Sequence, residues 1–164
     1  MKKMNDFNFL LERVIDQAEK INIPVSHNIS PDVIVNKRAV RRLGCCKKDK
    51  NGRFTIELSA DLIDAPEKSC MQTLAHEVIH TCPKCFDHGE KFKKYAALMN
   101  STYGYDISRT ASREEMGIEI KTPCRYIIKC EKCGAKTERV KRSPLVDNPA
   151  RYRCRCGGKL VRIK

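Results

Sequence analysis

The chain has 164 residues, 41% of them hydrophobic, which suits one compact domain with a small module attached and is short for two full domains. No apolar stretch reaches the roughly 20 residues that a transmembrane helix needs, so we expect no membrane partner. The net charge of +13 is concentrated at one end: residues 121–164 hold 14 Lys and Arg against 3 Asp and Glu, and residues 1–120 hold 19 against 17. This asymmetry predicts a polyanionic partner, with nucleic acid as the first candidate and a solvated basic face as the alternative.

The 10 cysteines either form disulfides or bind metal. The N-terminal stretch FNFLLERVIDQ is interrupted by Glu12, Arg13 and Asp16, so it lacks the apolar run of about 7–15 residues found in a secretory signal. We therefore expect a cytoplasmic protein, in which thiols stay reduced and paired cysteines indicate zinc.

In chain order, the first predicted element is an amphipathic helix that begins after Asn5 or Asp6 and ends before Pro24. Residues 33–59 are rich in β-forming residues and contain an Asn-Gly turn, which predicts a small antiparallel sheet.

A second helix is predicted from near Asp64 to about Thr81, where Pro83 stops it, and a third at roughly residues 89–100. Residues 101–122 are polar and aperiodic, and we interpret them as an irregular connection.

The motif HEVIH, residues 76–80, lies in the second predicted helix. Positions i and i+4 share a helix face, with Cβ atoms about 5–6 Å apart, so His76 and His80 can reach one zinc ion. Glu77 is then placed to act on the water whose pKa the zinc lowers to about 7. A catalytic zinc usually takes a third protein ligand. His88, at the start of the third predicted helix, is the candidate, and His27 is given no role.

Two cysteine pairs mark the basic C-terminal module. Cys130 and Cys133 lie in CEKCG, and Cys154 and Cys156 lie in CRCGG after 20 intervening residues. Four thiolates from two short turns predict a tetrahedral structural zinc site in a β ribbon. The second pair is CxC where a ribbon normally has CxxC, so Cys124 stays open as a substitute ligand.

A third pair, Cys82 and Cys85, forms a CPxC turn between the motif helix and His88. A zinc there would need further ligands, and Cys45 and Cys46 supply the nearest candidate pair. Adjacent strand residues point to opposite faces, so both could bind one ion only at a bend. Unligated thiols or a redox pair are the favoured interpretations, with a third zinc at Cys82 and Cys85 as an alternative.

HEVIH followed after seven residues by HGEKF resembles the SprT-like zinc metalloproteases, the SprT/Spartan family. RLGCCK and FTIELSADLI resemble the sheet that precedes the motif helix in this family, and YRCRCGGKL resembles the end of the zinc ribbon in bacterial SprT proteins. The metzincin pattern HExxHxxGxxH does not fit, because Pro83 and Phe86 stand where its Gly and third His would be.

The resemblance implies a zinc-dependent metalloendopeptidase with His76, His80 and His88 as zinc ligands and Glu77 as general base. Spartan-type members digest proteins covalently trapped on DNA, so the implied substrates are proteins at or near DNA. The alternative is a nucleic-acid-binding zinc protein whose HExxH site is structural or vestigial. The presence of Glu77, which a structural site would not need, favours the enzyme.

We therefore predict an α+β fold: a small antiparallel sheet with zincin-type helices that carry HExxH, followed by a small β zinc ribbon. The expected domains are a SprT-like protease domain at 1–122 and a basic zinc-ribbon module at 123–164. The expected cofactors are one catalytic and one structural zinc ion, and the expected partners are a protein substrate and DNA, the latter bound through the basic module.

Overall fold

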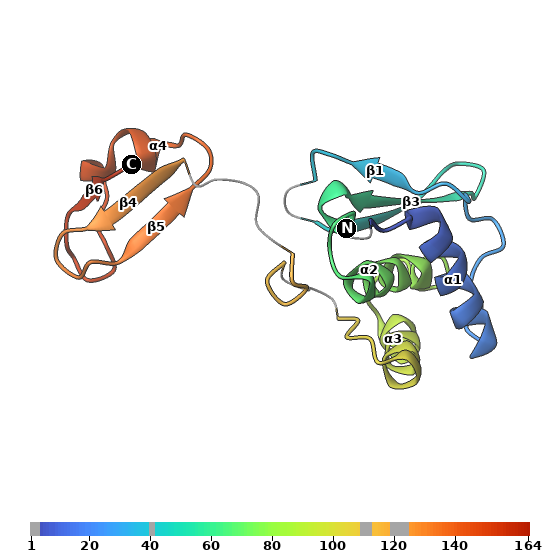
Figure 1. Ribbon diagram of the computed structural model, residues 1–164. Helices are drawn as coiled ribbons and strands as arrows, with labels where there is room; N and C mark the ends of the chain where they lie inside the picture. Colours follow the sequence, from blue (N-terminus) through green and yellow to red (C-terminus); the bar gives the residue numbers. More distant parts are fainter. Residues whose placement is uncertain (1–3, 40–41, 109–112, 119–124) are drawn as a thin grey trace. The chain divides into compact units, whose positions relative to one another are not determined.

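The computed structural model describes residues 4–39, 42–108, 113–118 and 125–164 (Figure 1). The chain folds as two compact units, Met1–Glu119 and Ile120–Lys164. Both mix helices with small sheets, as the predicted α+β class requires.

The N-terminal unit begins with helix α1 (Phe7–Lys20). Asp6 caps it, because its carboxylate accepts hydrogen bonds from the backbone N–H groups of Asn8 and Phe9. One stripe of the helix is buried, formed by Phe7, Leu10, Leu11, Val14 and Ala18. The first predicted helix is therefore confirmed, down to its cap.

The sheet of this unit has three strands, β1 (Ile34–Asn36), β2 (Gly44–Lys48) and β3 (Phe54–Ser59), in the order β1-β3-β2. β2 and β3 form the expected antiparallel hairpin. β1 pairs with the other edge of β3 in parallel, so the sheet is mixed, and the prediction of a purely antiparallel sheet was wrong in this respect. Alternation along the sequence identifies strands, but it does not say which strands become neighbours.

Helix α2 (Glu67–Ile79) contacts α1, α3 (Glu90–Tyr103), β2 and β3. Figure 1 shows the three helices on one side of the sheet. Most of α2 is buried, including Met71, Leu74, Ala75, Val78 and Ile79. The helix that carries HEVIH is therefore held from several sides, which fixes the direction of its side chains. No described helix has the length and hydropathy needed to cross a bilayer.

The segment after α3 has no helix or strand among its described residues, as predicted, but it packs on the N-terminal unit and does more than connect. α3 continues to Tyr103, and Tyr105, Ile107, Met116 and Ile118 are all buried in the core of the N-terminal unit. The Ser69 hydroxyl on α2 donates to the Met116 carbonyl at 2.7 Å. These apolar residues have no regular spacing, so periodicity did not reveal that they pack on the unit.

The C-terminal unit is built on a three-stranded antiparallel sheet of β4 (Tyr126–Cys130), β5 (Lys136–Arg139) and β6 (Leu160–Arg162), in the order β5-β4-β6. Short helical turns, α4 (Pro144–Asp147) and η2 (Pro149–Arg151), precede β6. Its buried residues include Ile128, Cys130 and Val146. So small a core is weak by itself, which agrees with a module that depends on metal.

Candidate metal centres and candidate active site

Three imidazole rings meet beside α2. The Nε2 atom of His76 lies 3.2 Å from Nε2 of His80 and 3.0 Å from Nε2 of His88. His76 lies on α2, His80 caps the C-terminal end of this helix, and His88 precedes α3. One nitrogen from each ring falls within 4.8 Å of the others. The structure thus brings together all three histidines that the sequence singled out.

Backbone carbonyls orient two of these rings. His80 Nδ1 lies 2.8 Å from the Cys85 carbonyl, and His76 hydrogen-bonds the Ser108 carbonyl. A carbonyl partner requires Nδ1–H on His80, so the Nε2 lone pair faces the other histidines. The Cys82–Cys85 turn and the segment after α3 therefore both help to arrange the cluster.

Phe92 on α3 packs against all three rings, with ring centroids 4.9 Å from His76, 4.7 Å from His80 and 4.8 Å from His88. Phe92 is itself buried. Phe92 lies within the third helix that the sequence predicted at roughly residues 89–100. Its position shows that this helix also forms an apolar support under the histidines.

The arrangement fits a zinc ion. Ligand nitrogens at about 2.0–2.1 Å from a tetrahedral zinc are roughly 3.3 Å apart, close to the separations of 3.0 and 3.2 Å. Burial, followed by the nearby His80 and His88, lowers the pKa of His76 to about 4. Burial is also the main cause that lowers the pKa of His80. Both rings are then neutral near pH 7, as metal ligands must be.

Glu77 is next to His76 on α2 but is not part of the nitrogen cluster. It is 6% exposed, and the backbone N–H of Cys46 in β2 donates to its carboxylate. Burial raises its pKa to about 7, against the opposing effects of the Cys46 N–H and the Arg42 guanidinium. A carboxylate with such a pKa can exchange protons near neutrality, which is what a general base requires.

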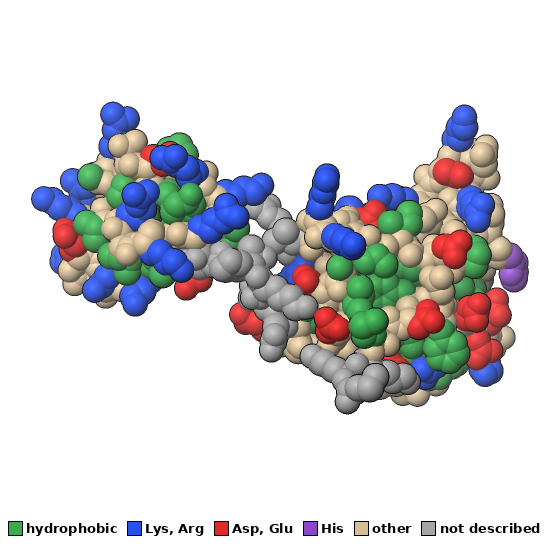
Figure 2. Space-filling view, turned by 45° about the horizontal axis from the view of Figure 1, so that its top comes forward, with side chains coloured by type: hydrophobic (Ala, Val, Ile, Leu, Met, Phe, Trp, Pro, Cys, Tyr) green, Lys and Arg blue, Asp and Glu red, His purple; other side chains and the backbone are tan. Residues whose placement is uncertain are grey.

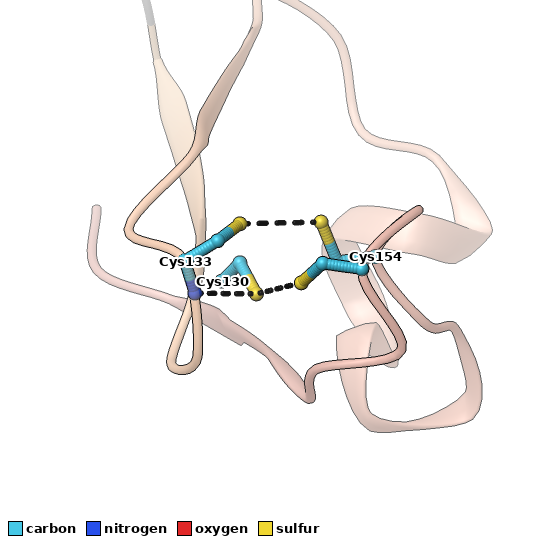
Figure 3. A group of neighbouring side chains, drawn as sticks. Cys130, Cys133 and Cys154 are labelled. Atoms are coloured by element: carbon cyan, nitrogen blue, oxygen red, sulfur yellow. Dashed lines mark hydrogen bonds between the residues drawn. The ribbon is translucent and has the colours of Figure 1, made fainter.

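Four cysteines gather in the C-terminal unit, and three of them are labelled in Figure 3. The Sγ atoms of Cys130 and Cys156 are 3.6 Å apart, as are those of Cys133 and Cys154. Zinc–sulfur bonds of about 2.3 Å in a tetrahedral site place the sulfurs roughly 3.8 Å apart. The CxC pair therefore places two thiols where a metal ion could take both as ligands. Cys124, the substitute ligand, lies outside the described residues.

A backbone N–H of the first knuckle favours the thiolate form of Cys130. The Cys133 N–H donates to Cys130 Sγ at 3.5 Å and is the main cause that lowers the pKa of the Cys130 thiol to about 6. A Cβ on Gly158 would lie 2.6 Å from Cys130 Sγ and 3.4 Å from Cys156 Sγ. A side chain at position 158 would therefore collide with Cys130 Sγ, so the close approach of the backbone to this thiol needs glycine.

Several other residues with side chains suited to metal binding or catalysis lie outside the two candidate metal centres. Cys82 and Cys85 are buried, and neither belongs to a group of three or more potential ligands within the described residues. Burial raises the pKa of the Cys82 thiol to about 12, which disfavours the thiolate. The hydroxyls of Tyr103 and Tyr105 both donate to Gln17 of α1. Tyr103, Tyr105 and Arg109 follow His88 in the sequence and are of types that can stabilise a transition state. Arg109 lies outside the described residues.

The fold and the site define an α+β protein with two candidate metal centres, one of three histidines beside an HExxH glutamate and one of four cysteines. The sequence model of the SprT-like family matches residues 11–113, which include all the histidines of the first centre. The chain belongs to the SprT-like family, a metalloprotease-type family.

The chain is also similar in sequence to a longer protein. The Germ cell nuclear acidic-1 protein of Caenorhabditis elegans is 29% identical to this chain over 137 residues. The match covers 79% of this chain but 24% of the relative. The chain thus spans about a quarter of that protein's length.

Proposed function

We propose that this protein is a zinc-dependent metalloendopeptidase that acts on protein substrates at or near DNA. The observation that carries the proposal is the convergence of the His76, His80 and His88 Nε2 atoms, with Glu77 adjacent to His76 on the same helix. Membership of the SprT-like family supports the same class of reaction.

In this proposal the three imidazoles hold the zinc ion. When bound, zinc would polarise the scissile carbonyl and lower the pKa of a water molecule. Glu77 would take a proton from the water that attacks the carbonyl carbon, and would deliver it to the amide nitrogen as the C–N bond breaks. The Cys46 N–H and the edge of β2 hold the Glu77 carboxylate in one orientation for both transfers.

The C-terminal unit supports the nucleic-acid part of the proposal. Figure 2 shows Lys and Arg side chains spread densely over this unit. Lys129 and Lys136 are directly opposite each other in β4 and β5, and both are exposed. Like charges in such cross-strand pairs are unfavourable, and a bound phosphate backbone would relieve the repulsion.

The proposed chemistry is tested with Glu77→Gln. The amide is nearly isosteric and cannot accept a proton, so zinc content should be unchanged while cleavage of a DNA-bound protein falls roughly 10²- to 10⁴-fold. Glu67→Gln, on the same helix but partly exposed and paired with Arg13, is the matched control and should cleave normally.

The alternative is a nucleic-acid-binding zinc protein whose histidine site is structural or vestigial. It predicts that the wild type, with both centres loaded and DNA present, cleaves no bound protein. Equal cleavage by wild type and Glu77→Gln would instead remove Glu77 from the mechanism.

A further inference from the structure

A pocket of about 520 Å³ lies beside His80, on the N-terminal unit. It is lined by the segment 24–27, by Lys48 and Phe54 at the ends of β2 and β3, and by residues 80–84 and Phe86 after α2. Pockets that bind small ligands measure about 300–1,000 Å³, so a large side chain and the peptide group that carries it can enter together.

The His80 ring lines both the pocket and the histidine cluster. Its Nε2 lies 3.2 Å from His76 Nε2, and its centroid lies 6.3 Å from the ring of Phe86 at the pocket. Successive residues of an extended chain are about 3.3 Å apart. A polypeptide whose scissile carbonyl lies at the cluster therefore has a side chain one or two positions away at the pocket.

The walls of the pocket are largely apolar. Val25 is 6% exposed and Phe54 is 7% exposed, and both belong to the packed interior, whereas Phe86 is 59% exposed. Phe86 therefore presents a large apolar ring to solvent next to the histidine cluster. An apolar side chain that entered would cover this ring and the floor beneath it, and removal of that surface from water favours binding.

The rim of the pocket is positively charged. Lys48 and Lys84 supply this charge, His27 also lines the pocket, and none of the described lining residues is Asp or Glu. The Lys48 ammonium lies 5.2 Å from the Phe54 ring centroid. Within the described residues neither lysine forms an ion pair. The rim thus complements negative charge on whatever enters.

We propose that this pocket binds a large apolar side chain of the substrate polypeptide, next to the cleaved bond, and that it favours substrates with acidic residues beside that side chain. The inference rests on the proposed function for the identity of the occupant as substrate. It gives Phe86 and Lys84 roles in specificity, and His27, which had no role in the sequence analysis, a place in the lining of the pocket.

The chain contains no tryptophan, so a tryptophan in a peptide reports its own burial by fluorescence. The probe is a short blocked peptide with one tryptophan between glutamates, titrated into zinc-loaded Glu77→Gln. We expect saturable binding with a blue shift. A control peptide with lysines in place of the glutamates should bind about tenfold more weakly. A peptide with alanine in place of tryptophan should compete poorly with the tryptophan peptide for the pocket.

Two variants have matched controls. Phe86→Ala in the Glu77→Gln background should weaken binding about tenfold, as truncation of an aromatic contact does. Phe9→Ala should leave binding unchanged, because Phe9 is a similarly exposed phenylalanine, 55%, on α1 and away from the pocket. Lys84→Glu should reduce the preference for the acidic peptide, whereas Lys50→Glu in the β2–β3 turn should not.

The outcomes separate this inference from the proposed function. Equal effects of Phe86→Ala and Phe9→Ala would overturn the pocket as a binding site, even if the protein is a peptidase. Cleavage of the peptide by the wild type at a bond one or two residues from tryptophan supports the assignment, and cleavage only at distant bonds overturns it. Phe86-dependent binding, with no peptide or protein cleaved by the wild type, would instead overturn the proposed function.

Discussion

Gly44 provides the space in which the Glu77 carboxylate lies. A Cβ at residue 44 would be 2.6 Å from Oε1 of Glu77 and 2.8 Å from its Cγ, closer than carbon atoms approach in proteins. Gly44 begins β2, and the Cys46 N–H two residues further on donates to the same carboxylate. The start of β2 therefore sets the position of Glu77 by shape and by one hydrogen bond.

Gly44→Ala should displace Glu77 while both metal centres remain loaded. The added methyl group forces the buried carboxylate away from the Cys46 N–H, so kcat should fall roughly 10- to 100-fold, part of the general-base contribution, with little change in KM. Zinc analysis and steady-state kinetics measure these effects. Amide hydrogen exchange supplies a readout that is independent of activity: the Cys46 amide should lose protection.

The control amide for this experiment is that of Lys47, which pairs with Thr55 in the β2–β3 ladder and should stay protected. In a Glu77→Ala background, Gly44→Ala should have no further effect on the Cys46 amide, because the carboxylate is already absent. If Gly44→Ala exposes Cys46 and Lys47 alike, the substitution acts on the strand and not on Glu77.

Purified protein should contain two zinc ions per chain, one at each candidate centre. His76→Ala should lose one of them and keep the other, because the two centres belong to separate units. Cys130→Ser should lose the second and also unfold the C-terminal unit, whose apolar core is small. Elemental analysis by mass spectrometry measures both. Three ions in the wild type, reduced to two by Cys82→Ser, would restore the third site.

The Glu57 carboxylate should make the sheet of the N-terminal unit sensitive to acid. Hydrogen bonds from Lys47, then from Asn36, lower its pKa to about 2 from 4.5, and Arg42 is also paired with it. Because the pKa in the folded protein is depressed, this stabilisation is complete above about pH 4.5 and is lost as the pH falls towards 2. Glu57→Gln should lower the free energy of unfolding near neutral pH by roughly 1–3 kcal/mol.

Urea unfolding of the wild type and Glu57→Gln over this pH range tests the prediction, with EDTA present so that zinc release affects both proteins equally. The difference between them should shrink as the pH falls. Glu90→Gln is the control, because Glu90 also pairs with a lysine but its side chain is 90% exposed, and exposed pairs contribute little. A difference for Glu57→Gln that does not change with pH would show that the carboxylate charge is not responsible.

The parts of this molecule that the sequence predicted depend on short spacings. His76, Glu77 and His80 lie within five residues of one helix, and CEKCG and CRCGG are local turns, so residue types and intervals were sufficient. His88 is eight residues further on, and its place at the start of the next predicted helix singled it out from the remaining histidines. The site parts that were missed come from distant segments: Gly44 and Cys46 in β2, and the Ser108 carbonyl after α3. Backbone groups have no signature in residue type, so only the fold shows that they reach the site.

DNA should stimulate cleavage of DNA-bound proteins, and the C-terminal unit should be the cause. Residues 121–164 carry a net charge of +11, from 14 Lys and Arg against 3 Asp and Glu. DNA held by the same chain raises the local concentration of any protein on that DNA. A chain that ends at Thr122 should therefore lose the stimulation by DNA while it keeps the zinc of the histidine centre. Cleavage rates with and without DNA measure the effect.

Substitutions in the full-length chain separate charge from loss of the unit. A triple variant should weaken DNA binding and reduce its salt dependence; it combines Lys129→Gln, Lys136→Gln and Arg155→Gln. The slope of the log binding constant against the log salt concentration should change by about 0.9 for each phosphate that is no longer neutralised on duplex DNA, or by about 0.7 on a single strand. The control removes the same number of exposed charges from the N-terminal unit, at Lys37, Lys50 and Lys68, and should leave the slope unchanged.

If both triple variants bind DNA as the wild type does, neutralisation of phosphates by these residues is not the basis of binding. If the shortened chain responds to DNA as the full chain does, the N-terminal unit binds it. If the full chain binds no DNA even at low salt, the basic unit serves another partner, and the proposal of cleavage near DNA must be abandoned. The proposal of peptide hydrolysis at His76, His80 and His88 does not depend on this result, because the Glu77→Gln experiment tests it separately.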